Sequence, residues 1–545
     1  MTHYDTQYYP YPSRRTAVYA KRGMVATSQH LAAQAGLEML KQGGNAVDAA
    51  IATAACLTVV EPSSNGIGGD AFALVWMKDR LHGLNSSGPA PQGLSLEALR
   101  EQGLTEMPMY GWTPVTVPGA PAAWAELARR FARLPLTTLL APAIAYAEEG
   151  YAVSPTTSRS WQTAFAEYRA AVQGEQYQSW FETFAPQGRA PAPGEWWRSP
   201  GHAATLRSIA ETGGESFYRG ELAGRIDAYS RQYGGYLRAE DLAAYTPEWV
   251  DPVSGSYRGY DVWELPPNGQ GIVTLMALNI LQQREDGGGN SGLEDELVDA
   301  RTHRELEAIK LAFEDGLWSI TDPRHMDEAR VAELLSAAYA SRQAARIGDQ
   351  ALLPHTGKPP GGGTVYLATA DGEGNMVSYI QSNYMEFGSG LVVPGTGIGL
   401  HNRGHTFSLD PNHPNALAPG KRTYHTIIPG FLSRGGRAIG PFGVMGAFMQ
   451  PQGHLQVLRQ MLDYGLNPQA ALDAPRWKWE QGRKVLIEPS FPEQLAQALR
   501  DRGHELEVAH NSGLFGRGQI IWRDEDSGVL CAGTDPRCDG VAASW

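Results

Sequence analysis

The chain has 545 residues, of which 42% are hydrophobic and 19% are charged, and these fractions are those of an ordinary globular protein. Its net charge is −13 and is spread along the chain, which disfavours nucleic acid and anionic membranes as partners. The three cysteines are too few, and odd in number, for a disulfide framework.

Residues 1–15 (MTHYDTQYYPYPSRR) contain no apolar run of the kind that a secretory signal needs, so we expect a cytoplasmic protein. The apolar run around Ala49–Val60 is too short and too rich in Ala and Thr to span a bilayer. We therefore expect no membrane partner.

The first predicted elements are two helices. Ser28 is the predicted N-cap of the first, and apolar residues follow it at helical spacing until Gly43–Gly44. The second helix starts near Asn45 and ends before Pro62. The loop Ser63–Asp70 (SSNGIGGD) then leads into AFALVWM, which has the composition of a buried strand, and Leu81–Pro91 is a strand that runs into a turn.

The chain from Pro118 to about Asp315 is predicted to be mainly helical. Charged and apolar positions recur at helical spacing in four segments: Ala122–Phe131, Ala141–Glu149, Ala203–Glu211 and Thr302–Asp315. Within this region, Tyr257–Leu265 (YRGYDVWEL) alternates like a strand, and a PPNGQG turn follows it.

The strongest break in the chain is Leu353–Gly363 (LPHTGKPPGGG), because its prolines and glycines cannot continue a helix or a central strand. Two strands are predicted directly after it, TVYLATAD and MVSYIQSNY, joined by the turn DGEGN. Further strands are predicted at Thr426–Leu432, Lys484–Glu488, Glu505–Ala509 and Gly518–Arg523. The part of the chain after Thr364 is thus expected to be richer in strands than the part before it.

The junction Gly361–Thr364 (GGGT) has a chemical interpretation. A threonine hydroxyl is a poor nucleophile without a base, but an N-terminal threonine supplies its own α-amine, with a pKa of about 7.7–8.0. That amine is free only if the bond between Gly363 and Thr364 is cut, and Gly363 lets the backbone bend so that the hydroxyl reaches the preceding carbonyl. Taken alone, a flexible linker that ends in Thr explains these four residues better.

Motifs along the rest of the chain favour the chemical interpretation. They are Gly43–Ala52 (GGNAVDAAIA), Glu61–Asp70, Val115–Ala120 (VTVPGA), Ala141–Val153, Tyr257–Gly271, the Thr364 strand, Pro419–Arg422 (PGKR), Asp463–Arg476 and Asp535–Arg537 (DPR). With these motifs in the family's order, the sequence from about Met24 to its C-terminus resembles the γ-glutamyltransferase superfamily of N-terminal-nucleophile hydrolases. It looks most like the cephalosporin-acylase-like and γ-glutamyltransferase-like members, and the oxamate amidohydrolases belong to the same broad branch.

The resemblance implies an α+β fold, a four-layer αββα sandwich, and self-cleavage before Thr364. The two fragments would be Met1–Gly363, mainly helical, and Thr364–Trp545, which carries the nucleophile, intertwined in one structural unit. Both contribute strands to the shared sandwich. The processed protein would be a heterodimer of its own fragments, and whether it forms a higher homo-oligomer stays open.

The resemblance also assigns the residues that carry out catalysis. Thr364 matches the nucleophile, and Gly446 and Ala447 fall where the family places its pair of oxyanion-hole N–H donors. The second family glycine is Ala447 here, which excludes some backbone geometries with positive φ. Ser382 falls near the family's second hydroxyl, which bonds the nucleophile, and Asn383 is beside it.

The residues that read a γ-glutamyl group in the family are mostly replaced. Ser87 stands at the place of a carboxylate-binding arginine, and Thr406 at the place of an ammonium-binding acid. A family glutamine becomes Arg403, and a Ser-Ser pair becomes His425–Thr426. We expect a pocket without the ammonium-binding acid, in which Arg403 binds a substrate carboxylate. The alternatives are a salt bridge for Arg403 and a hydrogen-bonded structural role for His425.

The segment Phe407–Lys421 is shorter than the loop that forms a lid in many relatives, which favours hydrolysis over transfer of the acyl group to an amine. The predicted function is therefore the hydrolysis of γ-glutamyl-type or related carboxylate-bearing amides. Three alternatives stay open: an oxamate-like amide as substrate, an acyl-lactam as substrate, and a catalytically degenerate relative that serves as a binding protein.

Other kinds of site have little support. His401, His405 and His413 cluster in sequence with Asp410, but no HExxH or comparable metal pattern is present. The GIGGD loop lacks the Lys-Ser/Thr of a phosphate-binding loop, and no GxSxG motif or Cys/His pairing is evident. We therefore expect no metal and no cofactor, and a small-molecule amide as the substrate.

Overall fold

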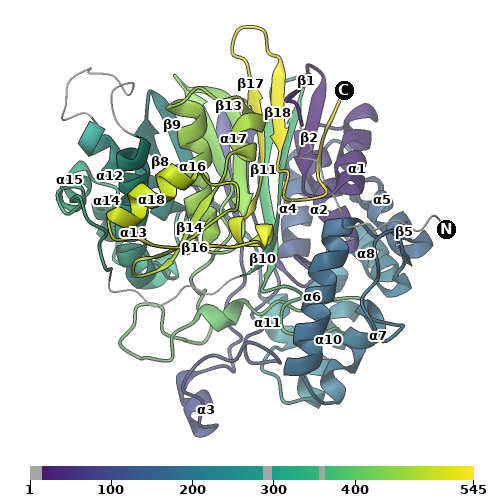
Figure 1. Cartoon of the computed structure of the whole chain (residues 1–545). Coiled ribbons are helices and arrows are strands. Elements are labelled where there is room, and N and C mark those ends of the chain that lie inside the picture. Colours follow the sequence, from purple (N-terminus) through teal and green to yellow (C-terminus); the bar gives the residue numbers. More distant parts are fainter. Residues whose placement is uncertain (1–14, 286–297, 355–361) are drawn as a thin grey trace.

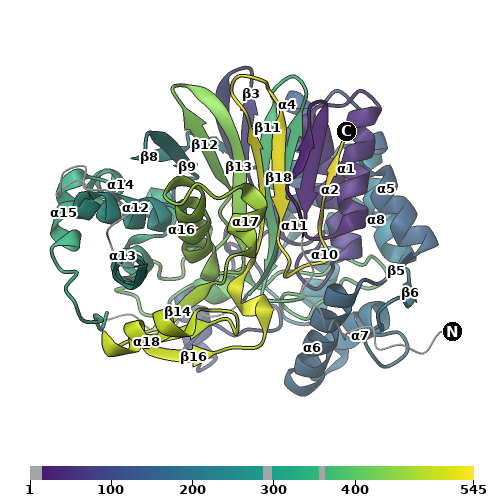
Figure 2. The same ribbon diagram turned by 45° about the horizontal axis from the view of Figure 1, so that its top comes forward.

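The computed structural model describes residues 15–285, 298–354 and 362–545. Two seven-stranded antiparallel sheets lie face to face between two layers of helices (Figures 1 and 2). This arrangement confirms the predicted αββα sandwich. Most of the predicted break at Leu353–Gly363 lies outside the described residues.

The first sheet carries the predicted cleavage site. Its strands, in spatial order, are β19 (Val541–Ser544), β2 (Gly23–Thr27), β10 (Gly363–Asp371), β11 (Met376–Tyr384), β3 (Asp70–Met77), β4 (Arg80–Ser86) and β7 (Glu248–Val250). Every residue of β3, β10 and β11 is buried, because helices cover one face of this sheet and the second sheet covers the other.

The second sheet runs in the order β1 (Val18–Ala20), β18 (Leu530–Thr534), β17 (Arg517–Arg523), β13 (Arg437–Met445), β12 (Gly430–Arg434), β9 (Tyr260–Glu264) and β8 (Val253–Tyr257). The single strand predicted at Tyr257–Leu265 is wrong. Arg258 and Gly259 both have positive φ (52° and 80°), so they form a tight two-residue turn that joins β8 and β9 as a hairpin.

The predicted strand at Thr426–Leu432 starts later than expected, at Gly430. The N–H of Ile427 bonds to the His425 ring, and that of Ile428 bonds to the side chain of Gln450. Both main-chain donors are thus used by side chains and not by a neighbouring strand. The other predicted strands of this half agree with the structure to within a residue or two, including β15 (Lys484–Ile487) and β16 (Glu505–Val508). These two form a small third sheet with β14 (Trp477–Gln481), which was not predicted.

Helices α1 (His30–Lys41) and α2 (Ala46–Val60) pack on the first sheet, and α12 (Gly271–Glu285) and α16 (Met449–Leu462) pack on the second. The remaining helices are α3 (Leu96–Glu101), α4 (Ala120–Phe131), α5 (Leu136–Glu149), α6 (Pro155–Ala171), α7 (Gln178–Phe184), α8 (Pro200–Thr212), α9 (Glu215–Tyr218), α10 (Glu221–Gln232), α11 (Ala239–Ala243), α13 (Val298–Ser319), α14 (Glu328–Leu334), α15 (Ala337–Ala344), α17 (Pro468–Asp473) and α18 (Glu493–Asp501). A short two-stranded sheet joins β5 (Tyr151–Ala152) to β6 (Trp196–Trp197).

The starts of the first two helices show how side chains set helix ends. The predicted N-cap Ser28 is wrong: the side chain of Gln29 caps α1 by accepting from the N–H groups of its first turn, and Ser28 donates to the carboxylate of Glu61. Helix α2 begins as predicted, because Asn45 and Asp48 form a capping box.

Strands from both sides of Gly363 interleave in the two sheets. Strands β2, β3, β4 and β7 precede it and share the first sheet with β10, β11 and β19, while β1, β8 and β9 share the second sheet with β12, β13, β17 and β18. Between the sheets, large apolar side chains such as Phe72, Tyr366 and Phe431 form one core. A cut before Thr364 would therefore leave two fragments held together by shared sheets and a shared core.

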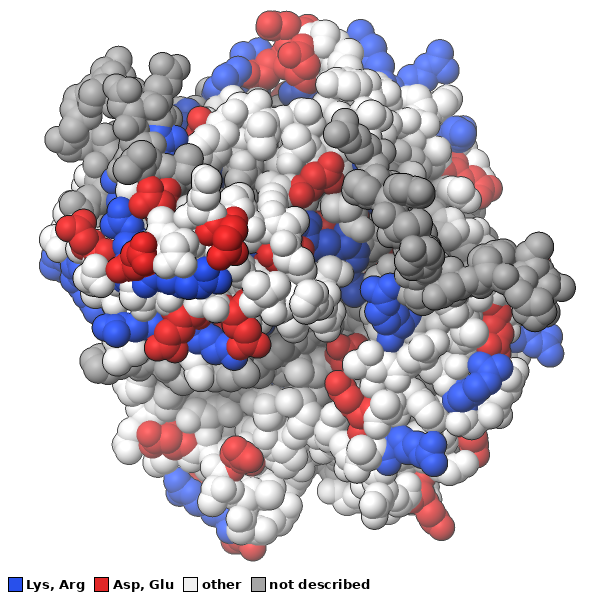
Figure 3. Space-filling model, in the orientation of Figure 1, with Lys and Arg blue, Asp and Glu red and all other residues white. Residues whose placement is uncertain are grey.

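On the face drawn in Figure 3, acidic and basic side chains are interspersed over the residues shown in colour. Among the described helices, none combines the length and the apolar character that crossing a membrane requires.

Candidate active site

Thr364 lies at the start of β10, where the pairing with β11 is irregular between Gly363 and Val365. Its hydroxyl donates a hydrogen bond to the carbonyl oxygen of Gly363 (2.7 Å) and lies 3.0 Å from the hydroxyl of Ser382. Ser382 donates to the same Gly363 oxygen (2.8 Å) and accepts from the N–H of Tyr384 (2.8 Å). In the uncut chain, two hydroxyl groups thus polarise the carbonyl before Thr364.

This triangle of oxygens suits nucleophilic attack. While Ser382 donates to the Gly363 oxygen, Thr364 can donate its own proton to Ser382 and turn a lone pair toward the Gly363 carbonyl carbon. As the carbonyl oxygen gains negative charge, the hydrogen bond from Ser382 strengthens, because bonds to ionised acceptors are stronger than neutral ones.

The backbone around the junction is strained. Tyr384, Glu386 and Ala447 have φ values of 75°, 42° and 50°, and a left-handed conformation costs about 1–2 kcal/mol in a non-glycine residue. A Cβ atom placed on Gly362 would lie 3.0 Å from the Cβ of Ala447 and 2.5 Å from the carbonyl oxygen of Tyr384. Only glycine fits where the chain passes these residues just before Thr364.

The predicted oxyanion donors lie between β13 and α16. Gly446 has a φ of 134°, and Ala447 adopts a φ of 50° despite its side chain. The Gly446 carbonyl accepts from the N–H of Met449 (2.9 Å), and the Ala447 carbonyl accepts from that of Gln450 (3.1 Å). Since the Gly446 carbonyl faces the start of α16, the Ala447 N–H on the other side of that peptide plane points away from the helix. This orientation suits a donor to a ligand, and the catalytic role of both residues stays a prediction.

A buried carboxylate lies beside this centre. Asp70 begins β3 and is in register with Ser382 on β11. Its Oδ2 accepts from Nε2 of His425 (2.9 Å) and lies 3.3 Å from Nδ1 of His401 and 3.7 Å from Nε of Arg403. Burial alone would raise the pKa of Asp70, but the two histidines outweigh that effect and hold the pKa below its usual range. Asp70 is therefore charged at neutral pH.

Arg403, in the short helix Arg403–Thr406, is fully buried. Burial lowers the pKa of Arg403 to about 10, so its guanidinium keeps its charge at neutral pH. Nη1 donates to the hydroxyl of Thr426 (2.8 Å), and the guanidinium carbon lies 4.4 Å from the ring centre of Tyr384. Nε and Nη2 have no hydrogen-bond partner among the described residues, and these two nitrogens form the edge that binds a carboxylate through two parallel hydrogen bonds.

His425 fits the structural alternative. Its Nε2 donates to Asp70, and its Nδ1 accepts from the N–H of Ile427 (3.4 Å), which together define one neutral tautomer. Burial, with the charge of Arg403 next in weight, lowers the pKa of His425 to about 3. His425 therefore stays neutral and holds Asp70 in place, and its predicted contact with substrate remains a prediction.

Ser87 and Thr406 bond to neighbouring protein groups. Ser87 donates to the side chain of Asn85 (2.7 Å), and among the described residues no hydrogen bond or ion pair joins it to Arg403. Thr406 lies 2.8 Å from the carbonyl oxygen of Arg403 and 2.9 Å from that of Tyr424, both in donor geometry. Thr406 thus fixes the turn that presents Arg403, and any contact of these two residues with substrate stays a prediction.

Asn383 packs against the glycine loop that precedes β3. A Cβ atom on Gly66 or Gly69 would lie 3.2 or 3.0 Å from its amide group, so these glycines make room for it. Its Oδ1 is buried without a hydrogen-bond partner among the described residues. Asn383 is therefore close to Asp70 in the fold, and its predicted contact with substrate is untested.

A cavity of about 560 Å³ adjoins the site, a volume in the range of small-molecule pockets. Thr406, Tyr424 and Phe448 line it, and the last of these directly follows Ala447 in the chain. The rings of Tyr424 and Phe448 stack with centres 5.7 Å apart. This cavity therefore offers an apolar wall between the loop that holds Arg403 and the loop that holds the oxyanion donors.

The histidines weighed above as metal ligands have separate partners. His401 lies against Asp70, Nδ1 of His405 lies 2.7 Å from the carbonyl oxygen of Met107, and Nδ1 of His413 accepts from the N–H of Asn415. They form no common site.

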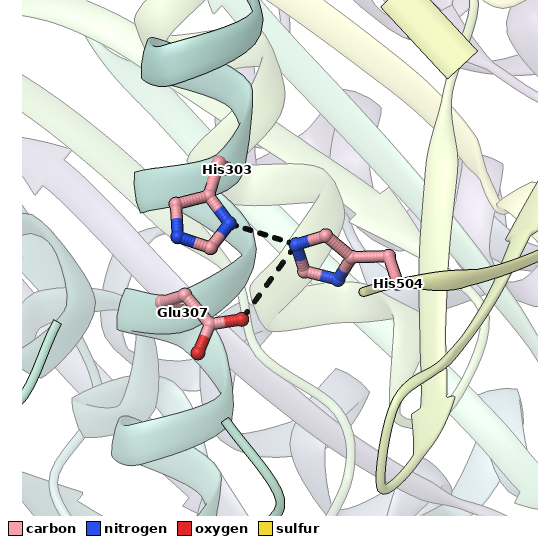
Figure 4. Close-up of side chains that lie close together, drawn as sticks. All are labelled: His303, Glu307 and His504. Carbon is pink, nitrogen blue, oxygen red and sulfur yellow. Dashed lines mark hydrogen bonds and ion pairs between the residues drawn. The ribbon is translucent and has the colours of Figure 1, made fainter. Parts of the chain in front are cut away.

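A different group of possible metal ligands lies away from Thr364 (Figure 4). His303 and Glu307 project from α13 toward His504, with 2.8 Å between the two imidazoles and 3.8 Å from His504 Nε2 to the Glu307 carboxylate. Lys310 donates to that carboxylate (2.7 Å) and lies 3.4 Å from Nδ1 of His504. An ammonium already balances the carboxylate, and each polar atom of the four side chains has a partner. The group therefore fits a hydrogen-bond network that joins α13 to the chain after Thr364.

Sequence reasoning missed Asp70 as a candidate site residue and weighed His401 only as a metal ligand. For Asp70 a signal existed: it is an acidic residue at the start of an otherwise apolar segment, and a buried charge needs partners. For the place of His401 beside Asp70 no local signal existed, because the two residues lie far apart in the sequence.

The chain is similar to known proteins in sequence and in fold. The profile of the family described as gamma-glutamyltranspeptidase matches residues 32–545. The chain is 37% identical to the glutathione hydrolase-like YwrD proenzyme of Bacillus subtilis, over 96% of this chain and 99% of that protein. It is 36% identical to the oxamate amidohydrolase proenzyme of Klebsiella pneumoniae, over 96% and 98%. The crystal structure of a cephalosporin acylase from Bacillus halodurans is 61% identical, with a TM-score of 0.95 over 100% of this chain and 99% of that one.

Proposed function

The chain belongs to the γ-glutamyltranspeptidase family and is a self-processing amidohydrolase of the N-terminal-nucleophile class, and from that premise we propose that it cuts itself before Thr364 and then hydrolyses amides whose acyl part carries a carboxylate. The observation that carries the substrate class is the unpartnered Nε–Nη2 edge of Arg403. A γ-glutamyl group and related carboxylate-bearing acyl groups are the candidates.

In the first step, Thr364 Oγ1 attacks the Gly363 carbonyl carbon, and the oxyanion keeps its hydrogen bond from Ser382. The C–N bond breaks, the Gly363 acyl group moves to the Thr364 oxygen as an ester, and water hydrolyses the ester. The α-amine of Thr364 is then free to act as a base. In turnover, Oγ1 attacks the substrate amide while the N–H groups of Gly446 and Ala447 hold the oxyanion, and water releases the acid.

Arg403 is proposed to bind the substrate carboxylate. Its buried Nε–Nη2 edge has lost its hydration, and no protein hydrogen bond compensates for that loss until a ligand binds. Its approach to Asp70 is 3.7 Å, longer than a hydrogen bond, so Asp70 balances the charge without using the donors. A substrate carboxylate can therefore occupy the Nε–Nη2 edge without breaking a hydrogen bond of the protein.

A second observation bears on the choice among acyl groups. Oδ1 of Asp70 is buried without a hydrogen-bond partner among the described residues, close to the unpartnered nitrogens of Arg403. The pocket expected to lack an acid at the position of Thr406 therefore has one nearby, Asp70, the last residue of the Glu61–Asp70 motif. An acyl group that offers an N–H donor beside its carboxylate uses both, which favours γ-glutamyl and oxamate-like groups over a glutaryl group.

The proposal that the enzyme hydrolyses its substrate and does not transfer the acyl group to an amine rests on the short segment Phe407–Lys421. Part of it lines the cavity of about 560 Å³, next to Tyr424 and Phe448. A substrate entrance without a long lid leaves the acyl-enzyme accessible to water. Measuring released acid against acyl-amine product in the presence of an amine acceptor tests this proposal.

The test of the substrate class is Arg403→Ala in the processed protein, assayed with glutaryl and γ-glutamyl p-nitroanilides. Truncating a buried, hydrogen-bonded charge partner costs about 2–5 kcal/mol of binding, so KM should rise by about 30-fold or more while kcat changes less. Arg403→Lys keeps the charge but not the planar edge, so its KM should lie between those of the wild type and Arg403→Ala. The methyl ester of the glutaryl substrate is the control, since it lacks the carboxylate. An equal KM for acid and ester in the wild type, or an unchanged KM in Arg403→Ala, would contradict the proposal.

A further inference from the structure

Gln270 directly precedes α12, and its side chain is fully buried. Both the nitrogen and the oxygen of its amide group form hydrogen bonds. Its Nε2 donates to the carbonyl oxygen of Thr426 (2.6 Å) and to that of Ala447 (2.9 Å). Its Oε1 accepts from the hydroxyl of Tyr424 (2.9 Å). Two carbonyl partners demand an N–H donor on one side, so the orientation of this amide is unambiguous.

The two carbonyls belong to different halves of the site. Thr426 holds Nη1 of Arg403, the residue proposed to bind the substrate carboxylate. Ala447 belongs to the loop that carries the proposed oxyanion donors, and it packs against the chain before the cleaved bond, where Gly362 passes. Gln270 is thus a single amide that joins the acyl-binding side to the oxyanion side.

The loop at Ala447 depends on such support. Its left-handed backbone, with a φ of 50°, is unfavourable for a residue with a Cβ and persists only where surrounding bonds determine it. The Ala447 carbonyl accepts from two donors, the N–H of Gln450 (3.1 Å) and the Gln270 amide. The first donor comes from the backbone of α16, so Gln270 is the side chain that ties the loop to the rest of the site.

We propose that Gln270 is a positioning residue that sets the oxyanion loop at Gly446–Ala447 relative to the Arg403 pocket, for self-cleavage and for turnover alike. The turnover part rests on the proposed amide hydrolysis, and the self-cleavage part rests only on the proposed cut before Thr364. Displacing a reacting group by about 1 Å can cost about 100-fold in rate, so losing this tie should be visible in both reactions.

The variant that removes both donors at nearly constant size is Gln270→Met. We expect self-cleavage, followed by intact mass, to slow at least about 10-fold, and kcat of the processed protein to fall by about 10- to 100-fold with a smaller change in KM. Gln456→Met is the matched control. Gln456 in α16 also donates to two backbone carbonyls, those of Gln452 (3.1 Å) and Trp477 (2.9 Å), and accepts from the N–H of Trp477 (3.2 Å).

Gln456→Met should lose stability but cleave itself and turn over at the wild-type rates. If Gln270→Met does not fold, Gln270→Glu keeps the size and, when protonated, one donor, so its defect should grow with rising pH relative to the wild type. Wild-type self-cleavage in Gln270→Met, or a loss no larger than that of Gln456→Met, would overturn the proposal. A wild type that cleaves itself but hydrolyses neither anilide would instead count against the proposed function, and the self-cleavage comparison would still decide the role of Gln270.

Discussion

The cleavage centre and the recognition pocket lie side by side but are built differently. Around Thr364, hydroxyl and backbone groups bond to one another, and the strain lies in the main chain, as at Tyr384 and Ala447. In the pocket, neutral His425 and charged Arg403 converge on Asp70, and Oδ1 of Asp70 and Nε and Nη2 of Arg403 have no hydrogen-bond partner among the described residues. One region is complete within the uncut chain, whereas the other has groups that a ligand would satisfy.

The difference teaches where chemistry and specificity are encoded. A centre made of backbone geometry tolerates few changes, because each carbonyl and N–H depends on the strand that carries it. A pocket made of side chains can exchange its charges while the strands stay in place. The buried network of His303, Glu307, Lys310 and His504 contrasts with this pocket, because each of its polar atoms has a partner.

The largest effect is expected from a variant that removes the nucleophile of the cleavage centre. Thr364→Ala should stay one chain and lose amide hydrolysis by more than about 10⁴-fold, since the variant lacks the hydroxyl that forms the ester. Intact-mass analysis and an anilide assay measure both effects. Thr364→Ser, which keeps a hydroxyl, should give two fragments at a lower rate. A wild-type protein that stays uncut yet hydrolyses amides would show that the cleavage centre is not what its geometry indicates.

Ser382→Ala tests whether the centre is complete without a ligand. It removes the hydroxyl that donates to the Gly363 oxygen and neighbours Thr364, so self-cleavage should slow by about 10²–10³-fold. Ser378→Ala is the matched control on the same strand, because Ser378 is also buried and lies 2.7 Å from the hydroxyl of Tyr366. Equal rates in the two variants would mean that Ser382 only supports the sheet.

Much of the fold could be predicted from the sequence, because its signals are local. The strands β10 and β11 follow from apolar runs around a DGEGN turn, and Asn45 marks the start of α2. The hairpin at Tyr257–Leu265 was missed because a two-residue turn at Arg258–Gly259 leaves the alternation on both sides unchanged.

In the candidate site, too, local features could be predicted and long-range contacts could not. Thr364 and its glycines are adjacent in sequence, so their chemistry could be read directly, with the resemblance to a family on both sides. The pocket could be read only in part: Arg403 was singled out, but Asp70 lies more than 300 residues away from it in the chain and meets it only when β3 lies beside β11. Pairings of that range have no signature in composition or periodicity.

The smallest expected effect sharpens the claim that the cleavage centre uses backbone groups. Ala447→Gly should stabilise the folded state by relieving a left-handed conformation that costs about 1–2 kcal/mol. The new glycine also gives the unfolded chain more conformational freedom, which lowers the stability of the fold by about 0.5–1 kcal/mol. The free energy of unfolding, measured with urea, should therefore rise by no more than about 1.5 kcal/mol. Self-cleavage should keep the wild-type rate, because the variant keeps the hydroxyl groups of Thr364 and Ser382 and the backbone groups of residue 447. A large loss of rate with unchanged stability would mean that the Cβ of Ala447, which packs near Gly362, positions the cleaved bond by contact.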